Sequence, residues 1–366
     1  MKLKMFALII SVVCVFTTFT ACGDDTGSNS TPGYTQVGSN SGEEIVSGKP
    51  EVEKYYNNLT GCYVEGSKNK ENLRPVAVMI NNLGKAQKVQ TGLAAASIIY
   101  ETFVEGGITR LLAIYKDVGS VGEIGSVRSA RYSYVDLANG HDALYFHCGL
   151  DKNYTQKLMK QLNLDNIDIN TGIYGDYGYR VKNGLAREHT MYTTGELIAK
   201  ALEEKDRRTE KNDKRANLYE AWQNFADEDE TVTLDGGVAE NMSVFFSSSY
   251  ITNFEYDAEQ GKYMKMNKSG NNTDYRTGEN LYYKNVLILF TTVGNFDDGY
   301  RVYSKLDGGS GYYCTNGNYI KIKWTKGDSY QPFKITDENG NPVKYSAGNS
   351  YVCITNKNRT DKTTIS

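Results

Sequence analysis

The chain has 366 residues, a formal net charge of −3 at pH 7, 39% apolar residues and 12% aromatic residues. Its length predicts two domains, at about 150 residues per domain. The nearly balanced charge excludes broad electrostatic attraction to nucleic acid, so no nucleic-acid partner is expected. The apolar content excludes a chain that is disordered throughout.

Residues 1–21 have the pattern of a bacterial export signal. Lys2 and Lys4 precede an uncharged, mainly apolar stretch, and small residues precede Cys22. The sequence Phe-Thr-Ala-Cys at 19–22 resembles a lipobox, after which the cysteine is acylated and becomes the first residue of the mature protein. We therefore expect Cys22 to anchor the protein on the extracytoplasmic face of the cell membrane. The alternative is a plain secretory signal with a coincidental cysteine. Loss of the two lysines would change the net charge from −3 to −5.

Residues 22–52 are predicted to form a flexible tether behind this anchor. They are rich in Gly, Ser, Asn, Thr and Asp and contain few large apolar residues. Such a segment cannot bury enough surface to offset the entropy lost on ordering. The partner that this organisation implies is the membrane, reached through the lipid anchor.

Residues 53–225 are predicted to form a mixed α/β domain. Apolar or β-branched runs indicate four strands, at 75–80, 97–105, 108–116 and 143–148. The second and third of these are expected to form a hairpin. Helices are predicted at 132–139, at 151–164 and in a charged connector over 193–229. The capping-box spacing of Thr193 and Glu196 predicts the start of the connector's first helix.

Residues 226–366 are predicted to form a mainly antiparallel β domain, because short strand-like segments alternate with turn clusters at a spacing of about 8 to 12 residues. The most apolar of these strands is predicted at 284–292. The predicted fold class is therefore α+β, with a mixed α/β N-terminal domain followed by a mainly antiparallel β C-terminal domain. Cys314 and Cys353 both lie in strand-like runs, and the sequence leaves open whether they form a disulfide.

Several segments resemble the YerB-type lipoprotein family. They are RPVAVMIN at 74–81, QTGL at 90–93, VGEIGSVRSAR at 121–131 and REHTMYT at 187–193. Residues 231–356 resemble the family's carboxy-terminal β domain. The resemblance implies a lipid-anchored, two-domain protein of mainly Gram-positive bacteria with no established activity. It supports the location and the architecture and supplies no reaction.

The Arg-rich turn at 126–131 is the main candidate for a binding site. A serine at the N-cap of the helix predicted over 132–139 would satisfy free amides, and the positive end of that helix attracts anions. Arg128 and Arg131 would then lie on one side of the first turn, where two guanidinium groups can grip phosphate or carboxylate. Arg110 on the neighbouring strand is a third candidate. The turn therefore predicts an anionic cell-envelope ligand.

Carboxylates of the same domain give the alternative for these arginines, which is a structural clamp on Glu101, Glu105 or Asp136. If residues 97–105 are extended, Glu101 and Glu105 share one face but lie ~13 Å apart, too far for a paired acid/base site on one strand. Each could instead pair with an arginine across the hairpin or contribute to a ligand or metal site. His189 is a further candidate.

The sequence leaves open whether the protein is an enzyme. A strand, a Ser-x-x-Arg turn and a following His-Cys-Gly segment occur in an order similar to that of LytR-CpsA-Psr phosphotransferases, which transfer cell-wall glycopolymers. The acidic residue usual in that family is replaced here, because Tyr132 follows Arg131. One alternative function is therefore a glycopolymer phosphotransferase or a hydrolase with Glu101, Glu105 or His189 as acid or base. Another is a scaffold for a second exported protein.

No metal or cofactor is expected. His141, His147 and His189 match no recognised ligand spacing, and the chain has no standard nucleotide-binding or zinc-protease motif. Neighbouring residues of a strand point to opposite faces, so His147 and Cys148 are expected to diverge instead of forming a nucleophile–base pair. That alternation predicts that Cys148 lies on a buried apolar face.

Overall fold

The computed structural model describes residues 52–219, 224–267 and 270–366. The predicted export signal, Cys22 and nearly all of the predicted tether lie outside the described residues. Residues Glu51–Ser366 form one compact unit. Within the described part of the chain, no helix is long and apolar enough to cross a membrane.

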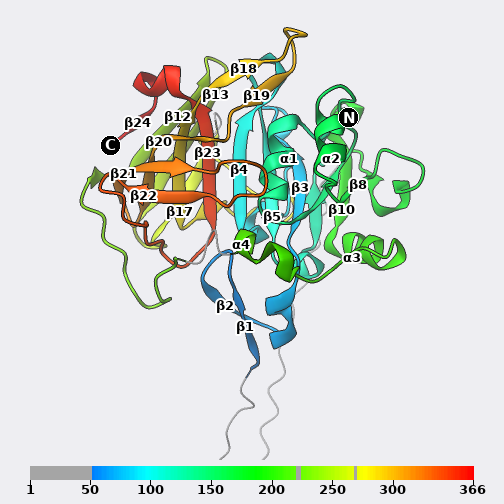
Figure 1. The fold of residues 1–366 in the computed structure, drawn as a ribbon, viewed down its shortest axis with the longest axis horizontal. Coiled ribbons are helices and arrows are strands. Elements are labelled where there is room, and N and C mark those ends of the chain that lie inside the picture. Colours follow the sequence, from blue (N-terminus) through cyan, green and yellow to red (C-terminus); the bar gives the residue numbers. More distant parts are fainter. Residues whose placement is uncertain (1–51, 220–223, 268–269) are drawn as a thin grey trace, which may run out of the picture. The chain divides into compact units, whose positions relative to one another are not determined.

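A sheet of eleven strands forms the centre of this unit (Figure 1). Its strand order is β11-β21-β20-β17-β23-β4-β5-β3-β7-β8, with β22 beside β21. Five strands come from the first half of the chain: β3 (Val76–Asn81), β4 (Ile98–Phe103), β5 (Thr109–Tyr115), β7 (Leu144–His147) and β8 (Asn166–Asp168). Six come from the second half: β11 (Gly237–Val238), β17 (Asn285–Thr291), β20 (Gly308–Thr315), β21 (Asn318–Thr325), β22 (Lys334–Asp337) and β23 (Ser350–Asn356).

The two halves join where β23 pairs in parallel with β4, with Ser350 opposite Ile98 and Cys353 opposite Glu101. Strands from the predicted domains 53–225 and 226–366 therefore share one sheet. The residues of β3, β4, β5 and β17 are all buried. Burial on both faces explains why these strands have continuous apolar runs instead of alternating patterns.

Two apolar cores cover the two faces of the central sheet. On one face, α1 (Tyr132–Asn139) and α2 (Thr155–Gln161) pack on β3 and β5, as Figure 1 shows. On the other face, α3 (Gly195–Glu204) and a second sheet share a core with the same strands. A further short helix, α4, spans Ala216–Tyr219.

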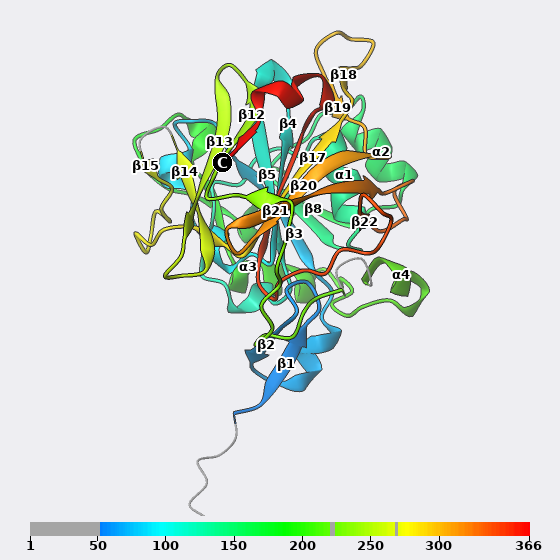
Figure 2. The same ribbon diagram turned by 90° about the vertical axis from the view of Figure 1, so that its left-hand side faces the viewer.

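The second sheet has six strands and lies beside the central one (Figure 2). Its strands are β12 (Asn241–Ser247), β13 (Tyr250–Asp257), β14 (Lys262–Asn267), β15 (Gly270–Asn271), β16 (Tyr282–Tyr283) and β24 (Thr364–Ile365). A three-stranded sheet has the order β6 (Glu123–Gly125), β10 (Met191–Thr194) and β9 (Tyr179–Arg180). Two pairs complete the structure: β1 (Lys54–Asn57) with β2 (Cys62–Glu65), and β18 (Val293–Asn295) with β19 (Val302–Ser304).

The structure confirms the local predictions with the strongest periodicity. The expected hairpin is β4–β5, the helix at 132–139 has the predicted bounds, and the apolar strand at 284–292 is β17. The helix predicted at 151–164 is shorter, because Asp151 accepts backbone hydrogen bonds from residues 153–155 ahead of it.

Two further expectations are corrected in detail. The connector over 193–229 is α-helical only at α3 and α4 among its described residues. The N-cap of α3 is Thr194, not Thr193: its hydroxyl accepts a hydrogen bond from the Leu197 amide at 3.1 Å.

Cys314 and Cys353 are free thiols. They lie on β20 and β23, which flank β17 on opposite sides, so about two strand spacings separate them, beyond disulfide reach.

Candidate functional site

The turn at 126–131 crosses the carboxyl ends of β3 and β7 in an extended conformation. Its backbone is fixed by hydrogen bonds to neighbouring segments: the Arg128 amide donates to the Met79 carbonyl at 2.8 Å, and the Arg128 carbonyl accepts from the Cys148 amide at 3.0 Å. Ser126 and Ala130 make similar bonds to Asn81 and Gly149. Strands β3, β7 and β8 run parallel here. In open α/β sheets, ligands bind outside the carboxyl ends of such strands.

The helix-terminus arrangement expected for this turn is wrong. Helix α1 begins at Tyr132 with Arg131 as its N-cap residue, and no side chain caps it. Arg128 lies in the extended segment before the helix, so Arg128 and Arg131 do not share a first helical turn. Their side chains accordingly have different partners.

Arg128 lines a cavity of about 390 Å³ together with two other arginines, Arg180 and Arg187. We call this cavity the arginine pocket. Its other polar lining residues are Ser129, Cys148, Asn170 and Glu188. The guanidinium of Arg180 donates to the Arg187 carbonyl at 2.6 Å, which holds these two exposed segments together.

The electrostatic balance of the arginine pocket is positive. Glu188 is its one carboxylate, and its oxygen lies 3.7 Å from the Arg128 guanidinium, with the Glu188 side chain half exposed. Burial lowers the pKa of Arg128 somewhat, but a guanidinium stays protonated in proteins. Three positive charges thus face one carboxylate, and the pocket can accept a further anion.

Sequence reasoning missed Arg180 and Arg187. Arg187 is the first residue of the REHTMYT segment, two residues before the candidate His189. Arg180 ends the two-residue strand β9 and carries no sequence signal. Only the pairing of β9 with β10 brings this part of the chain to the carboxyl ends of the central strands.

Arg131 makes the structural clamp that was the alternative for the turn. Its Nε lies 2.7 and 2.9 Å from the two carboxylate oxygens of Glu105, whose side chain is buried. The Nε of Arg301 lies 3.7 Å from the same Glu105 carboxylate. It also lies 3.9 Å from a carboxylate oxygen of Asp151. Arg131 is therefore neutralised by Glu105 and does not line the arginine pocket.

Arg110, on β5, is a buried support beneath the turn. Its guanidinium donates to the Ser129 carbonyl. Burial, with smaller contributions from the positive charges of Arg131 and Arg128, lowers its pKa to about 9. Its contact with the backbone of the turn indicates that Arg110 positions the turn.

Glu101 belongs to a different place in the fold. Its carboxylate, fully buried on β4, faces the second sheet and accepts hydrogen bonds from Thr252 at 2.8 Å and Tyr351 at 2.6 Å. The expectation that Glu101 and Glu105 share one face is wrong, because β4 ends at Phe103 and a 3₁₀ turn over Glu105–Gly107 redirects the chain. The expectation of an arginine partner for Glu101 is also wrong, since its hydrogen-bond donors are uncharged.

His189 lies behind the arginine pocket and not in its lining. It is buried, its Nδ1 is 2.7 Å from the Asn81 amide nitrogen, and its Nε2 is 3.7 Å from Glu188. Burial lowers its pKa. Burial also lowers the pKa of His141, to about 3. Among the residues described, no group of three or more His, Cys, Asp or Glu side chains is placed to hold a metal ion.

The prediction for Cys148 is confirmed in part: its side chain packs against the apolar core that contains Leu144 and Phe146, but it is only half-buried. Strand β7 ends at His147, and Cys148, the next residue, also lines the arginine pocket. Burial raises the pKa of its thiol, with the nearby guanidinium groups opposing that shift. The site is therefore an arginine pocket with a protonated thiol at its wall.

Comparison with known proteins identifies the family. Residues 59–210 match the profile described as "Protein of unknown function (DUF3048) N-terminal domain", and residues 242–352 match the corresponding C-terminal domain. YerB of Bacillus subtilis (strain 168), which is named as a candidate lipoprotein, is 30% identical over 259 residues, 69% of this chain and 72% of that protein. The chain belongs to the DUF3048 family. The resemblance found in the sequence and the two-domain architecture are thereby confirmed.

The crystal structure of YerB from Bacillus subtilis has the same fold. It superimposes with a TM-score of 0.70 at 25% identity and covers 86% of this chain and 100% of that chain. All residues of the arginine pocket fall within the DUF3048 N-terminal domain, between residues 127 and 191. A single domain of the family thus supplies the whole candidate site.

Proposed function

We propose that this protein is a lipoprotein, anchored at Cys22 on the extracytoplasmic face of the membrane, that binds an anionic cell-envelope ligand in the arginine pocket. The observation that carries the proposal is the cavity of about 390 Å³ at the carboxyl ends of β3, β7 and β8, where three guanidinium groups face one carboxylate. Guanidinium groups bind phosphate and carboxylate through paired N–H donors.

The proposed location is supported by the lipobox-like sequence before Cys22 and by the lipoprotein name of the Bacillus subtilis relative. Acyl chains on a cysteine contribute about 0.8 kcal/mol for each CH₂ that enters the bilayer, so a doubly or triply acylated residue holds stably. The test is cell fractionation of Cys22→Ser, which should move the protein from the membrane to the medium. Retention of this variant in the membrane would contradict anchoring at Cys22.

The proposed ligand carries at least one phosphate or carboxylate group. Arg128 is held by backbone contacts on both sides, so it is pre-positioned for an anion. Arg180 and Arg187 are exposed and add two further guanidinium groups to the lining of the pocket. Each charge-assisted hydrogen bond contributes about 1.5–3 kcal/mol, which corresponds to roughly tenfold or more in Kd for each arginine removed.

Thermal-shift titration of the mature protein tests ligand binding. The probes are inorganic phosphate, phosphorylated lipid-linked precursors and muropeptides, and at least one should raise Tm saturably, with weaker binding at higher ionic strength. Arg128→Ala/Arg187→Ala should abolish the shift. Arg276→Ala/Arg359→Ala removes two guanidinium groups that lie outside the arginine pocket and should leave the shift intact. If no probe stabilises the protein, or both variants respond equally, the proposal fails.

Acid/base catalysis by the predicted candidates receives no support from the geometry. Glu101, Glu105 and His189 are all buried, and none of them lines the arginine pocket. Glu105 is engaged by Arg131, and Glu101 accepts hydrogen bonds on both of its oxygens. Binding is therefore the function that we propose for the arginine pocket.

A further inference from the structure

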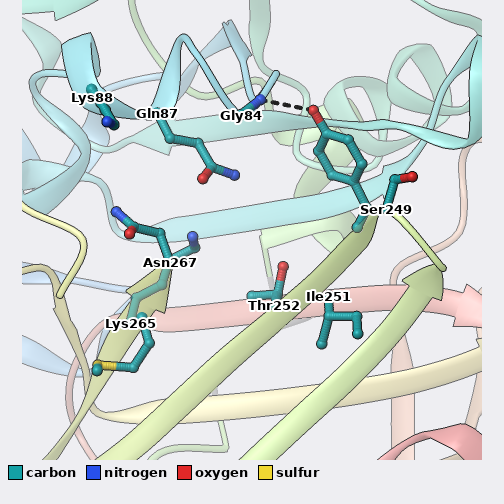
Figure 3. A pocket seen from close by; sticks show the side chains of 10 residues that line it. Gly84, Gln87, Lys88, Ser249, Ile251, Thr252, Lys265 and Asn267 are labelled. Atoms are coloured by element: carbon teal, nitrogen blue, oxygen red, sulfur yellow. Dashed lines mark hydrogen bonds between the residues drawn. The ribbon is translucent and has the colours of Figure 1, made fainter. Parts of the chain in front are cut away.

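A second cavity, of about 200 Å³, lies between the two DUF3048 domains. Figure 3 shows the segment that carries Gly84 and Gln87 on one side and strands β13 and β14 on the other. We call this cavity the interlayer pocket. Its polar lining residues include Gln87, Lys88, Tyr250, Thr252, Lys265 and Asn267.

Lys265 at the wall of the interlayer pocket has unused donors. Its side chain is buried, at 1% exposure, and donates one hydrogen bond, to the Asn272 carbonyl oxygen at 3.0 Å. Its Nζ also lies 5.9 Å from the centroid of the Tyr351 ring, but it makes no second hydrogen bond to the described residues, so N–H donor capacity remains for a ligand. A buried polar group without a hydrogen-bond partner destabilises the fold, and a charged group does so more strongly. An oxygen atom of a ligand in the cavity would accept a further hydrogen bond from Lys265.

Hydrogen-bond acceptors stand around the same space. The Thr252 hydroxyl donates its hydrogen to Glu101, so its lone pairs remain for the cavity. The Gln87 amide nitrogen donates to Asn82, which leaves the Gln87 carbonyl oxygen as an acceptor. Figure 3 shows the Gln87 amide and the Thr252 hydroxyl directed toward the cavity from opposite sides. The pocket therefore offers donors and acceptors side by side.

The deep part of the interlayer pocket is balanced in charge. Burial lowers the pKa of Lys265, and the negative charge of Glu101, which lies directly behind Thr252, opposes that shift. An anionic ligand at Lys265 would be repelled by the Glu101 carboxylate, because only the Thr252 hydroxyl group would separate the two negative charges. A cationic ligand would be repelled by Lys265 itself. Lys88, the other charged residue of the lining, is exposed, so around the buried Lys265 the electrostatics favour a neutral ligand.

We infer that the interlayer pocket binds one ring of a neutral sugar. A hydroxyl group both donates and accepts a hydrogen bond, so one sugar hydroxyl can accept from Lys265 and donate to Thr252 or Gln87. The volume of about 200 Å³ is below the range of about 300–1,000 Å³ typical of larger ligands, which suits a single ring. Tyr250 supplies an aromatic surface of the kind on which sugar rings pack.

The inference is independent of the arginine pocket. The arginine pocket is formed by residues 127–191, whereas the interlayer pocket is formed by residues 84–88 and 249–267. The two sites share no lining residue. Failure of sugar binding would consequently leave the proposed anion binding standing, and the reverse also holds.

Ligand-detected NMR titration of the mature protein tests the inference. The probes are glucose, galactose, mannose, N-acetylglucosamine and N-acetylgalactosamine, with inorganic phosphate and acetate as anionic comparators. At least one neutral sugar should bind saturably, and neither anion should compete with it. Binding by none of the sugars, or displacement of a sugar by phosphate or acetate, would overturn the inference.

Matched variants assign the binding to this pocket. Lys265→Met removes the buried donors, and Lys262→Met removes an exposed ammonium group from the same strand, β14. The first should weaken sugar binding at least tenfold, and the second should have no effect. If Lys265→Met does not fold, Gln87→Met replaces it as the test variant, because Gln87 is partly exposed and its substitution should leave the fold intact. Gln87→Met should weaken sugar binding several-fold. Arg128→Ala/Arg187→Ala should bind sugar normally; equal sugar binding by wild type and Gln87→Met would refute the assignment.

Discussion

Replacing Glu101 with glutamine should destabilise the protein, because four donors converge on this carboxylate. One oxygen accepts from Asn82 at 2.9 Å and Thr109 at 2.7 Å. The other accepts from Thr252 at 2.8 Å and Tyr351 at 2.6 Å. A glutamine amide has one oxygen and one NH₂ group, so in either orientation two donors would face a donor. The site is fully buried, and water cannot replace the lost acceptor.

The expected loss in the free energy of unfolding follows from the number of hydrogen bonds that Glu101→Gln removes. Two hydrogen bonds to a charged acceptor are worth about 3–6 kcal/mol. Rotation of the hydroxyl groups and relief of the buried charge offset part of this, so we expect a net loss of about 2–4 kcal/mol in the free energy of unfolding. At about 2–4 °C for each kcal/mol, Tm should fall by at least about 4 °C.

Urea denaturation followed by circular dichroism measures the effect, with Glu255→Gln as the control. Glu255 is exposed on β13, so its variant should stay within about 0.5 kcal/mol of wild type. The double variant Glu101→Gln/Lys265→Met should lose less than the two single losses combined, because the charges of Glu101 and Lys265 compensate each other. A Glu101→Gln protein as stable as Glu255→Gln would refute the reasoning, since the four donors would then not depend on the carboxylate.

Three other predictions concern buried groups. Arg131→Ala leaves the buried carboxylate of Glu105 without its closest cation, and should cost about 3 kcal/mol in urea denaturation; an unchanged midpoint would contradict the clamp. Burial lowers the pKa of His141 from 6.5 to about 3, so the unfolded chain binds a proton there that the folded chain does not. Stability should therefore fall by about 1.4 kcal/mol per pH unit from this group as pH drops from 6.5 toward 3, and His141→Phe should flatten the slope measured by urea denaturation at several pH values. Cys314 and Cys353 should both be alkylated in denaturant without reductant, as mass spectrometry can show, and should be protected in the native protein, where burial raises the pKa of both thiols; a need for reductant would indicate a disulfide.

Periodicity predicted the regular elements because they are set by local patterns. The continuous apolar runs gave β3 and β17, and the helix at 132–139 was found at its true bounds. The same reasoning failed where an element ends. Extending the alternation of β4 to Glu105 placed that side chain on the wrong face, since β4 stops at Phe103. Beyond the end of β7 at His147, Cys148 still packs against the predicted core, but it is only half-buried.

The candidate site was only partly predictable, because its walls come from separate segments. Arg128 was found from the density of arginines in its turn, but the partners that complete the pocket depend on long-range pairing. Arg180 and Arg187 reach Arg128 through the sheet β6-β10-β9. No local pattern carries that information, so two of the three arginines of the pocket are brought there by tertiary structure.

Glu101 links the two DUF3048 domains energetically as well as spatially. Asn82 and Thr109 of the N-terminal domain satisfy one carboxylate oxygen, and Thr252 and Tyr351 of the C-terminal domain satisfy the other. Parallel pairing of β4 with β23 closes the sheet at the same place, with Cys353 opposite Glu101. A buried charge with half of its donors removed is costly, so separating the domains would carry that penalty in addition to the exposed strand edge. The physical unit is therefore the pair of domains, and a ligand in the interlayer pocket, which contacts both, would stabilise them together.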